Sequence, residues 1–270
     1  MRFLQEEKPR KPIPGVRSGV VLRKQRFGCG WGLPGGFSLT TANAFAPREA
    51  ALNWRILASH LGVSPEAIRA LRQVHGVSVV RRFRDEDTAD PDADSPGARS
   101  SIIAGPPADA QWTTARGVVL VVFVADCCPV VLADPERDIV AIAHAGWRGA
   151  LLGVVPSLLD AIHVGGARND GIYAWIGPCA EGDAYEVGPE VAERFCEYPE
   201  ALRLSSGTPP RSLLDVRTVI RTQLDRRGVR PERISLSPIG TIGSTRHHSH
   251  RRDRYSSGRM VTYAMLSVND

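Results

Sequence analysis

Two cysteines and a histidine stand at the facing ends of two apolar runs in the middle of the chain. Asp126-Cys127-Cys128-Pro129 follows the apolar run 118–125, and His144 follows a second run, 139–143. Thiolate sulfur and imidazole nitrogen are ligands that zinc prefers in proteins. If the chain folds back between the two runs, a cysteine and a histidine can therefore bind one metal ion.

The second run and the short apolar segment 130–132 before it predict an antiparallel hairpin that turns near Pro135. A loop of two or three residues there places either Cys127 or Cys128 opposite His144. Opposed residues on one face of a sheet have Cβ atoms about 5 Å apart, which is close enough to share a metal ion. Because adjacent residues of a strand point to opposite faces, only one cysteine can bind and the other belongs in the core. The spacing leaves the choice between them open.

His75 is the best candidate for a third ligand, because it is a polar residue within the otherwise strand-like stretch 74–81. Three protein ligands of this kind, with a fourth position left open, are typical of a catalytic zinc site rather than a structural one. The alternative is that His75 is a hydrogen-bonded histidine of the core or the surface. The two ligands of the hairpin favour the first interpretation.

Arg148 begins an expected helix directly after the histidine end of the hairpin, in Gly146-Trp147-Arg148-Gly149. A guanidinium and the free N–H groups of a helix N-terminus both favour anions, so this corner could hold an anion bound at the metal. The alternative places Trp147 in the core and Arg148 on the surface.

A second cationic cluster, residues 246–254 followed by Gly258-Arg259, precedes the last expected strand. It could bind phosphate or nucleic acid, or it could be a solvated turn. It has no interleaved aromatic residue apart from Tyr255, which argues against a groove for nucleic acid. Cys179 follows a strand without a neighbouring histidine, and we interpret it as a small buried residue.

Length and composition are typical of a soluble globular protein. The chain has 270 residues, of which 43% are hydrophobic and 23% charged, so it can bury a sizeable core. Its longest apolar run is far too short to span a bilayer and its charged N-terminus has no signal-peptide pattern, which predicts a cytoplasmic protein. Five cysteines without regular spacing agree with a reducing compartment. The net charge is +5 and all but three basic residues are arginine, which suits a phosphate-bearing or anionic substrate.

Strand and helix patterns are mixed along the chain without strict alternation, and no internal repeat stands out. This favours a single α+β domain over residues 17–270, with mixed β-sheets layered and flanked by helices in an αββα-like arrangement. Residues 1–16 are expected to be a flexible arm and residues 84–100 an acidic surface loop. The expected helices are 48–61, 147–163, 189–198 and 214–227, and the expected strands are 18–22, 74–81, 118–124, 130–132, 139–143, 172–176, 233–236 and 260–268.

Short motifs spread from about Gly35 to the C-terminus form an ordered series. They are Gly36-Phe37-Ser38, Asn53, Arg72-Gln73-Val74-His75-Gly76, Ala108-Asp109-Ala110, Ala125-Asp126-Cys127 with Pro129, His144-Ala145-Gly146-Trp147-Arg148-Gly149, Gly177-Pro178, Tyr185-Glu186-Val187, Ser249 with Arg251-Arg252, and Gly258-Arg259. The series resembles the laccase-domain family, which is also called multicopper polyphenol oxidase or peptidoglycan editing factor. The motifs in the middle of the series are highly specific.

The resemblance implies a zinc-dependent purine nucleoside phosphorylase, which uses phosphate to cleave adenosine, inosine, guanosine or methylthioadenosine, with adenosine deaminase activity as well. It implies that the metal ligands are His75, Cys127 and His144, and so it selects Cys127 over Cys128. The expected partners are a small-molecule nucleoside and phosphate, without nucleic acid or membrane. The expected assembly is a monomer or a homodimer.

Phosphorolysis needs groups that hold an anion and a group that protonates the departing base. The residues expected to bind substrate or phosphate are Ser38, Arg148, Arg251 and Arg252, and those expected to take part in catalysis are Asp126, Arg148 and Glu186. The chain departs from the family pattern in a shorter segment between Ser38 and Asn53 and in Gly240, which stands where the family commonly has a cysteine. These departures bear on substrate preference and activity.

Three other functions are compatible with the same residues. A copper-dependent polyphenol oxidase is suggested by one family name, but a single His/Cys/His set is too small for several coppers. A thiol hydrolase would use Cys127 with His75 or His144 and need no metal. A non-catalytic binding protein would hold a structural zinc. A peptidoglycan-editing function is implied only by the resemblance to the family.

Overall fold

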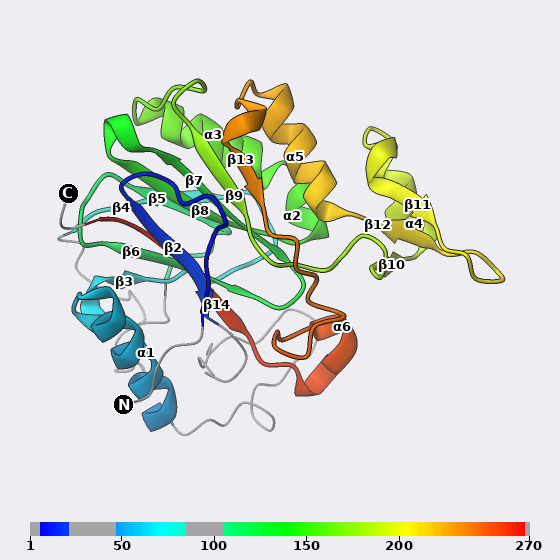
Figure 1. The fold of residues 1–270 in the computed structure, drawn as a ribbon, viewed down its shortest axis with the longest axis horizontal. Coiled ribbons are helices and arrows are strands. Elements are labelled where there is room, and N and C mark those ends of the chain that lie inside the picture. Colours follow the sequence, from blue (N-terminus) through cyan, green and yellow to red (C-terminus); the bar gives the residue numbers. More distant parts are fainter. Residues whose placement is uncertain (1–5, 22–46, 85–104, 268–270) are drawn as a thin grey trace.

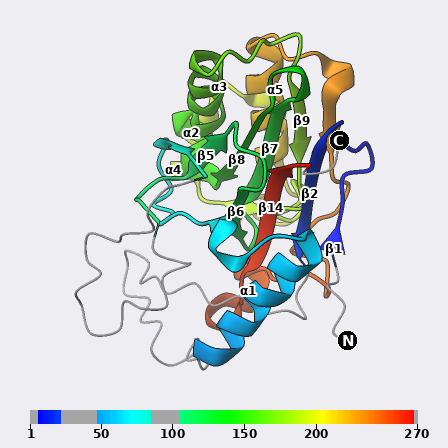
Figure 2. The same cartoon turned by 90° about the vertical axis from the view of Figure 1, so that its left-hand side faces the viewer.

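The computed structural model describes residues 6–21, 47–84 and 105–267 of the chain. Two large sheets pack face to face and helices cover their outer faces, so that the layers run helix, sheet, sheet, helix (Figure 1, Figure 2). The expected α+β fold, with layered sheets flanked by helices, is confirmed. No helix in the described parts of the chain is both long and apolar enough to cross a membrane.

The first sheet contains both the first and the last strand of the described chain. Its order is β1 (Glu6–Glu7), β2 (Val16–Val21), β14 (Met260–Leu266), β6 (Val119–Val124) and β3 (Ile68–Arg69). Helix α1 (Pro47–Leu61) covers the outer face, where Trp54 and Leu57 pack against Val121. The amphipathic pattern of this helix therefore has the sheet as its partner.

The second sheet carries the hairpin that the sequence predicts. Its order is β13 (Ile234–Leu236), β9 (Tyr173–Ile176), β7 (Cys128–Asp134), β8 (Ile139–Ala145), β5 (Ala110–Thr113) and β4 (Val79–Arg82). Helices α2 (Trp147–Leu152), α3 (Val154–Val164) and α5 (Val216–Arg226) pack on its outer face.

Strands β7 and β8 are buried along their whole length. In β7, Val130 and Leu132 face the helices, whereas Val131 and Ala133 face the other sheet. Because both faces of the sheet are covered, both sets of alternate side chains must be apolar. This is the reason that the sequence shows continuous apolar runs instead of an alternating pattern.

A small third sheet and several short helices complete the fold. The sheet has the order β10 (Glu186–Val187), β12 (Ser212–Leu214) and β11 (Leu202–Leu204). The short α-helices are α4 (Pro189–Ala192) and α6 (His250–Asp253). Turns of 3-10 helix occupy 65–67, 135–137, 193–195, 199–201, 231–233 and 254–256.

Several expected elements differ from the structure. The helix expected over 147–163 is two helices, because Gly153 has a left-handed backbone with φ 88° that ends α2 and begins α3. The strand expected over 74–81 begins only at Val79. The helix expected over 189–198 ends as α4 at Ala192 and continues as a 3-10 turn.

Part of the N-terminal arm expected over 1–16 belongs to the first sheet. Glu6 and Glu7 pair with Val21 and Val20 in antiparallel register. Ionic and hydroxyl contacts add to this pairing, because the hydroxyl of Tyr263 donates to the Glu6 carboxylate at 2.6 Å. Glu6 and Glu7 are therefore paired with a strand although they lie in a segment rich in charge and proline.

Candidate metal centre

Three side chains from separate elements converge where β7 begins and β8 ends. The ligand atoms of His75, Cys127 and His144 all lie within 4.8 Å of one another. Zinc binds sulfur at about 2.3 Å and imidazole nitrogen at about 2.0 Å, so one ion placed between the three atoms can reach all of them. Within the described ranges these residues form the one group of at least three potential metal ligands.

The hairpin brings Cys127 to His144 with a register that differs from the expected one. Pro129, and neither cysteine, pairs with His144, because the turn from Pro135 to Asp138 has four residues instead of two or three. Cys127 lies two residues before Pro129 and is diagonal to His144 on the same face. The diagonal arrangement still brings the sulfur within reach of the ring.

Cys128 belongs to the core, as expected for the cysteine that does not face His144. It is fully buried, and its sulfur lies 2.8 Å from that of Cys179, which is also fully buried. The interpretation of Cys179 as a small buried residue is confirmed.

His75 is held in a backbone conformation that non-glycine residues rarely adopt, with φ 60°. The buried carboxylate of Asp109 accepts hydrogen bonds from three successive backbone N–H groups, those of Val74, His75 and Gly76, at 2.7–3.1 Å. These bonds offset the strain of the left-handed backbone. Asp109 therefore fixes the loop that presents the first ligand.

Asp109 also orients the third ligand. Its Oδ1 lies 2.8 Å from Nδ1 of His144, and both side chains are almost completely buried. A carboxylate on one ring nitrogen fixes the tautomer and leaves Nε2 for the metal. Burial opposes the charge of Asp109, but the contacts with His144, Gly76 and Val74 hold the pKa of this carboxyl below its ordinary value. Asp109 was not among the expected site residues, although it lies in one of the sequence motifs.

Gly146 is required by the closeness of the ligands. A Cβ atom at this position would lie 3.0 Å from Sγ of Cys127 and 3.2 Å from Cδ2 of His75. Any larger residue would therefore push two ligands apart. The glycine permits the chain leaving β8 to pass directly beside the site.

Cys127 and His144, two of the three candidate ligands, form a thiolate–imidazolium pair, and the imidazolium must release its proton before its nitrogen can bind a metal ion. Burial opposes the thiolate of Cys127, but the charge and hydrogen bonds of His144, and those of His75, lower its pKa to about 6. Burial likewise opposes a charged His144, but the Cys127 thiolate and Asp109 raise its pKa to about 9. The cysteine is thus deprotonated at neutral pH, which is the form that binds a metal ion.

Asp126 links the metal centre to the C-terminal cationic segment. One carboxylate oxygen accepts a hydrogen bond from the hydroxyl of Thr241, and the other accepts one from the backbone N–H of Arg251, both at 2.6 Å. Its backbone has φ 79°, and its carbonyl accepts a hydrogen bond from the N–H of Ala180. With both oxygens occupied, Asp126 is better suited to hold Arg251 in position than to transfer a proton.

Tyr185 is a further residue near the metal ligands that sequence reasoning did not select. The guanidinium of Arg251 stacks over its ring at 4.7 Å, and the same guanidinium donates to the backbone carbonyl of Glu186. Burial and the Cys127 thiolate raise the pKa of Tyr185 to about 12, against the opposite effect of Arg251. Its hydroxyl is therefore protonated at neutral pH. Its place in the motif Tyr185-Glu186-Val187 was the only sign of it in the sequence.

The remaining expected site residues are placed differently from one another. Arg148 is exposed, and its guanidinium carbon lies 4.3 Å from the ring centroid of Trp147. Trp147 is half-buried against the core. The carboxylate of Glu186 is about half exposed and lies 3.7 Å from Nε of Arg211, so it faces an arginine. Ser38 lies outside the described residues.

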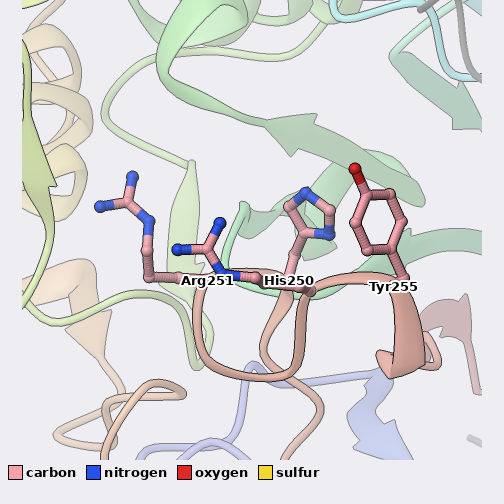
Figure 3. A pocket seen from close by; sticks show the side chains of 4 residues that line it. His250, Arg251 and Tyr255 are labelled. Carbon is pink, nitrogen blue, oxygen red and sulfur yellow. The ribbon is translucent and has the colours of Figure 1, made fainter.

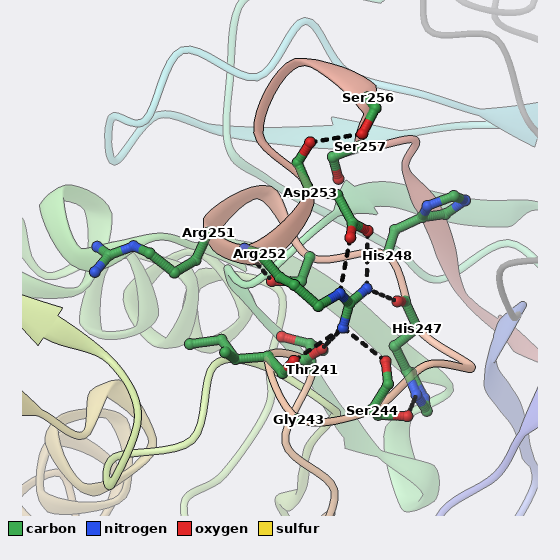
Figure 4. Close-up of polar contacts among 12 residues, drawn as sticks. Thr241, Gly243, Ser244, His247, His248, Arg251, Arg252, Asp253, Ser256 and Ser257 are labelled. Carbon is green, nitrogen blue, oxygen red and sulfur yellow. Dashed lines mark hydrogen bonds and ion pairs between the residues drawn. The ribbon is translucent and has the colours of Figure 1, made fainter.

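Arg252 has a structural environment that contradicts its expected role in phosphate binding (Figure 4). Its guanidinium donates to the backbone carbonyls of four residues and to the carboxylate of Asp253. All three nitrogens are thereby engaged, which leaves no donor free for an anion. The four carbonyls belong to Thr241, Ile242, Ser244 and His247.

Gly240 is explained by its neighbour. A Cβ atom here would lie 2.2 Å from the carboxylate of Glu181, which accepts the backbone N–H groups of Ile242 and Gly243. A cysteine at this position would collide with Glu181. Glycine at position 240, the departure from the family pattern, therefore leaves room for the Glu181 carboxylate that binds the backbone of Ile242 and Gly243.

Comparison with known proteins gives consistent results. The family described as multi-copper polyphenol oxidoreductase laccase matches residues 27–267. The chain is 37% identical over 222 residues to the purine nucleoside phosphorylase SCO2081 of Streptomyces coelicolor, covering 82% of this chain and 84% of that protein. It is 32% identical to adenosine deaminase RL5 from an unknown prokaryotic organism, covering 76% and 78%. The crystal structure of YlmD from Geobacillus stearothermophilus superposes with a TM-score of 0.78 at 25% identity, covering 97% of this chain and 98% of that one.

Proposed function

We propose that this chain, which belongs to the multi-copper polyphenol oxidoreductase laccase family and is similar to proteins named for nucleoside reactions, is a zinc-dependent purine nucleoside phosphorylase. Its substrates would be adenosine, inosine, guanosine or methylthioadenosine together with phosphate. Adenosine deamination would be a second activity, as in the name of one relative. The observation that carries the proposal is the convergence of His75, Cys127 and His144.

The donor set fits zinc better than several coppers. One thiolate and two imidazoles with an open fourth position are typical of catalytic zinc. A multicopper oxidase needs more ligands, and the described parts of the chain contain one such group. Zinc, when bound, would act as a Lewis acid on substrate or water.

In phosphorolysis, a phosphate oxygen forms a bond to C1′ of the ribose while the bond from C1′ to the base breaks. The electron pair leaves with the base, which takes up a proton, and the products are free base and ribose 1-phosphate. Arg148 and Arg251 would bind the phosphate, because each guanidinium is held on an aromatic ring with donors still free. Asp126 would position Arg251 through its backbone N–H.

The test is incubation of the purified protein with adenosine, inosine and methylthioadenosine, with and without phosphate. We expect phosphate-dependent release of free base and ribose 1-phosphate, and loss of this activity in Cys127→Ser. Inosine formed from adenosine without phosphate would show the deaminase activity. Absence of base release from zinc-loaded protein would contradict the proposal, and oxygen uptake on phenols with stoichiometric copper would support an oxidase instead.

A thiol hydrolase is a second candidate, because Cys127 and His144 form a thiolate–imidazolium pair. Such an enzyme would keep its activity after removal of metal and lose it on alkylation of Cys127. The phosphorylase would lose activity in both treatments. Comparing chelated with alkylated protein therefore separates the two.

A further inference from the structure

Four side chains of helix α6 and of the turn after it, here together called the α6 segment (residues 249–256), line a pocket of about 260 Å³. They are His250, Arg251, Arg254 and Tyr255. The candidate metal ligands are not among the lining residues. Figure 3 shows His250, Arg251 and Tyr255 projecting from this segment toward the same side. The pocket therefore has one wall built from consecutive turns of a single segment.

The lining of this pocket is cationic. Two guanidinium groups and one imidazole face it, and the described residues that line it include no carboxylate. Within the described parts of the chain, neither Arg251 nor Arg254 forms an ion pair with an acidic side chain. Burial and the positive charges of Arg259 and Arg251 lower the pKa of His250, against the effect of Asp126. An anion would offset the mutual repulsion of these groups.

Backbone strain holds Arg254 at the pocket. Its φ is 48°, a value that costs free energy in any residue other than glycine. The backbone N–H of Arg254 donates to the carbonyl of His250, and its own carbonyl accepts from Ser257. Strain of this kind is retained mainly where a side chain must be placed for function.

The segment beneath the pocket is rigid. Arg252 fastens it to four backbone carbonyls, and the hydroxyl of Ser249 caps α6 by accepting from the N–H of Arg252. The guanidinium groups are thus presented by a fixed turn, which reduces the entropy lost when a ligand binds.

Arg251 connects the pocket to the metal centre. Its backbone N–H binds Asp126, the residue before Cys127, and its guanidinium lies over Tyr185. Arg251 therefore belongs both to the pocket lining and to the contacts around Asp126 and Tyr185.

We propose that this pocket binds inorganic phosphate, with Arg254 as a ligand that acts together with Arg251 and His250. The identity of the anion rests on the proposed phosphorolysis, whereas the site itself rests on the pocket, its charge and its strained arginine. Tetrahedral phosphate offers oxygens to two guanidinium groups at once. Tyr255, which is exposed, would border the opening.

The test is calorimetric titration of the full chain, in phosphate-free buffer, with orthophosphate. Arg254→Gln should weaken binding about tenfold, because it removes charge-assisted hydrogen bonds, and Arg254→Lys should recover part of the loss. Arg246→Gln is the matched control, since it removes the same charge from an exposed position of the cationic cluster 246–254 without lining the pocket. It should change the affinity less than twofold.

Equal affinity of wild type and Arg254→Gln would overturn the proposal, as would an equal loss in Arg246→Gln. Adenosine 5′-monophosphate is a second probe, because its phosphate offers similar oxygens. Arg254-dependent binding of the nucleotide without binding of the free ion would overturn the assignment to inorganic phosphate.

The titration does not depend on turnover, so its failure is distinguishable from failure of the proposed function. If base release occurs but the KM for phosphate is unchanged in Arg254→Gln, the pocket assignment is wrong and the phosphorylase stands. If phosphate binds through Arg254 but no base is released, the pocket stands and the phosphorylase is wrong.

Discussion

Asp109 connects both histidine ligands of the candidate metal centre through a single buried carboxylate. It accepts three backbone N–H groups of the His75 loop and also contacts Nδ1 of His144. A neutral amide cannot accept all of these bonds, because its nitrogen is a donor. The geometry of the ligands therefore depends on the charge of a residue that does not touch the metal.

Asp109→Asn should lower zinc affinity about 10- to 100-fold, since the ring of His144 and the loop of His75 lose their common support. Competition with a chromogenic chelator measures the affinity. Asp138→Asn is the control, because Asp138 is an acidic residue in an exposed ion pair with Arg116. Unchanged zinc affinity in Asp109→Asn would show that the carboxylate does not orient the ligands.

Gly146→Ala should also weaken zinc binding, because the new methyl group would lie 3.0 Å from Sγ of Cys127. We expect at least a tenfold loss, equivalent to about 1.4 kcal/mol. The same chelator competition tests this, with circular dichroism to show that the fold is retained. A folded variant with wild-type zinc affinity would contradict the placement of Gly146 against the ligands.

Two adjacent arginines of helix α6 have different roles, one in the proposed phosphate binding and the other in holding the loop before the helix. Arg252 uses its donors on backbone carbonyls, whereas Arg251 keeps part of its guanidinium free over Tyr185. Lysine cannot reproduce the planar fork of arginine. Substitution by lysine at the two positions should therefore affect different properties, stability at Arg252 and phosphate binding at Arg251.

Arg252→Lys should destabilise the protein by about 2 kcal/mol, because several buried carbonyls lose their donor. Arg251→Lys should leave stability within about 0.5 kcal/mol and raise the KM for phosphate. Urea unfolding and steady-state kinetics distinguish the two results. A similar loss of stability in both variants would contradict this division.

The carboxylate of Glu6 in strand β1 binds the hydroxyl of Tyr263 in strand β14, and its pKa is lowered. Burial opposes the charge of Glu6, but hydrogen bonds from Lys8 and Tyr263 and the charge of His60 hold its pKa below 4.5. A lowered pKa in the folded state means that the charged form stabilises the fold. This stabilisation is present above pH 4.5 and is lost as the pH falls through the lower, folded value.

Glu6→Gln should therefore reduce the free energy of unfolding by about 1 kcal/mol at pH 7, and the difference from wild type should shrink below pH 4. Urea unfolding at both pH values measures it. Glu136→Gln, which neutralises an acid that is about three-quarters exposed, is the control. A difference that does not depend on pH would contradict the charged role of Glu6.

Considering the molecule as a whole, the candidate metal centre combines residues of the second sheet's hairpin with a residue of the loop that connects the two large sheets. Its ligands come from the β7–β8 hairpin and from the loop between β3 and β4, which belong to different sheets. A bound metal ion should therefore stabilise the whole fold, since it binds the folded protein and not the unfolded chain.

Removal of metal with a chelator should lower the melting temperature by about 10 °C, because zinc at 1,000 times its Kd contributes about 4 kcal/mol. Added zinc should restore the original value, and Cys127→Ser should show neither change. Differential scanning fluorimetry measures the shift. A larger stabilisation by copper than by zinc would favour the oxidase alternative.

The layered α+β fold, the β7–β8 hairpin and two histidines with a cysteine as potential ligands can be predicted from the amino-acid sequence, because apolar periodicity and metal-binding residue types are local properties. The choice of Cys127 over Cys128 came from the resemblance to the family. Cys127 and His144 lie at the ends of one hairpin, so a single turn brings them together. The sequence also shows that Asp126 adjoins a potential metal ligand and that residues 246–254 form a cationic cluster.

The hairpin register, the contacts of Asp109 and Tyr185, and the difference between Arg251 and Arg252 could be seen only in the folded chain. Register depends on the number of residues in the turn, which is left open by the apolar pattern. Asp109 accepts hydrogen bonds from backbone groups 33–35 residues away, and Arg252 donates to backbone carbonyls of the preceding loop. Backbone groups have no residue type to recognise. Identical side chains therefore acquire different roles from the atoms that the fold places around them.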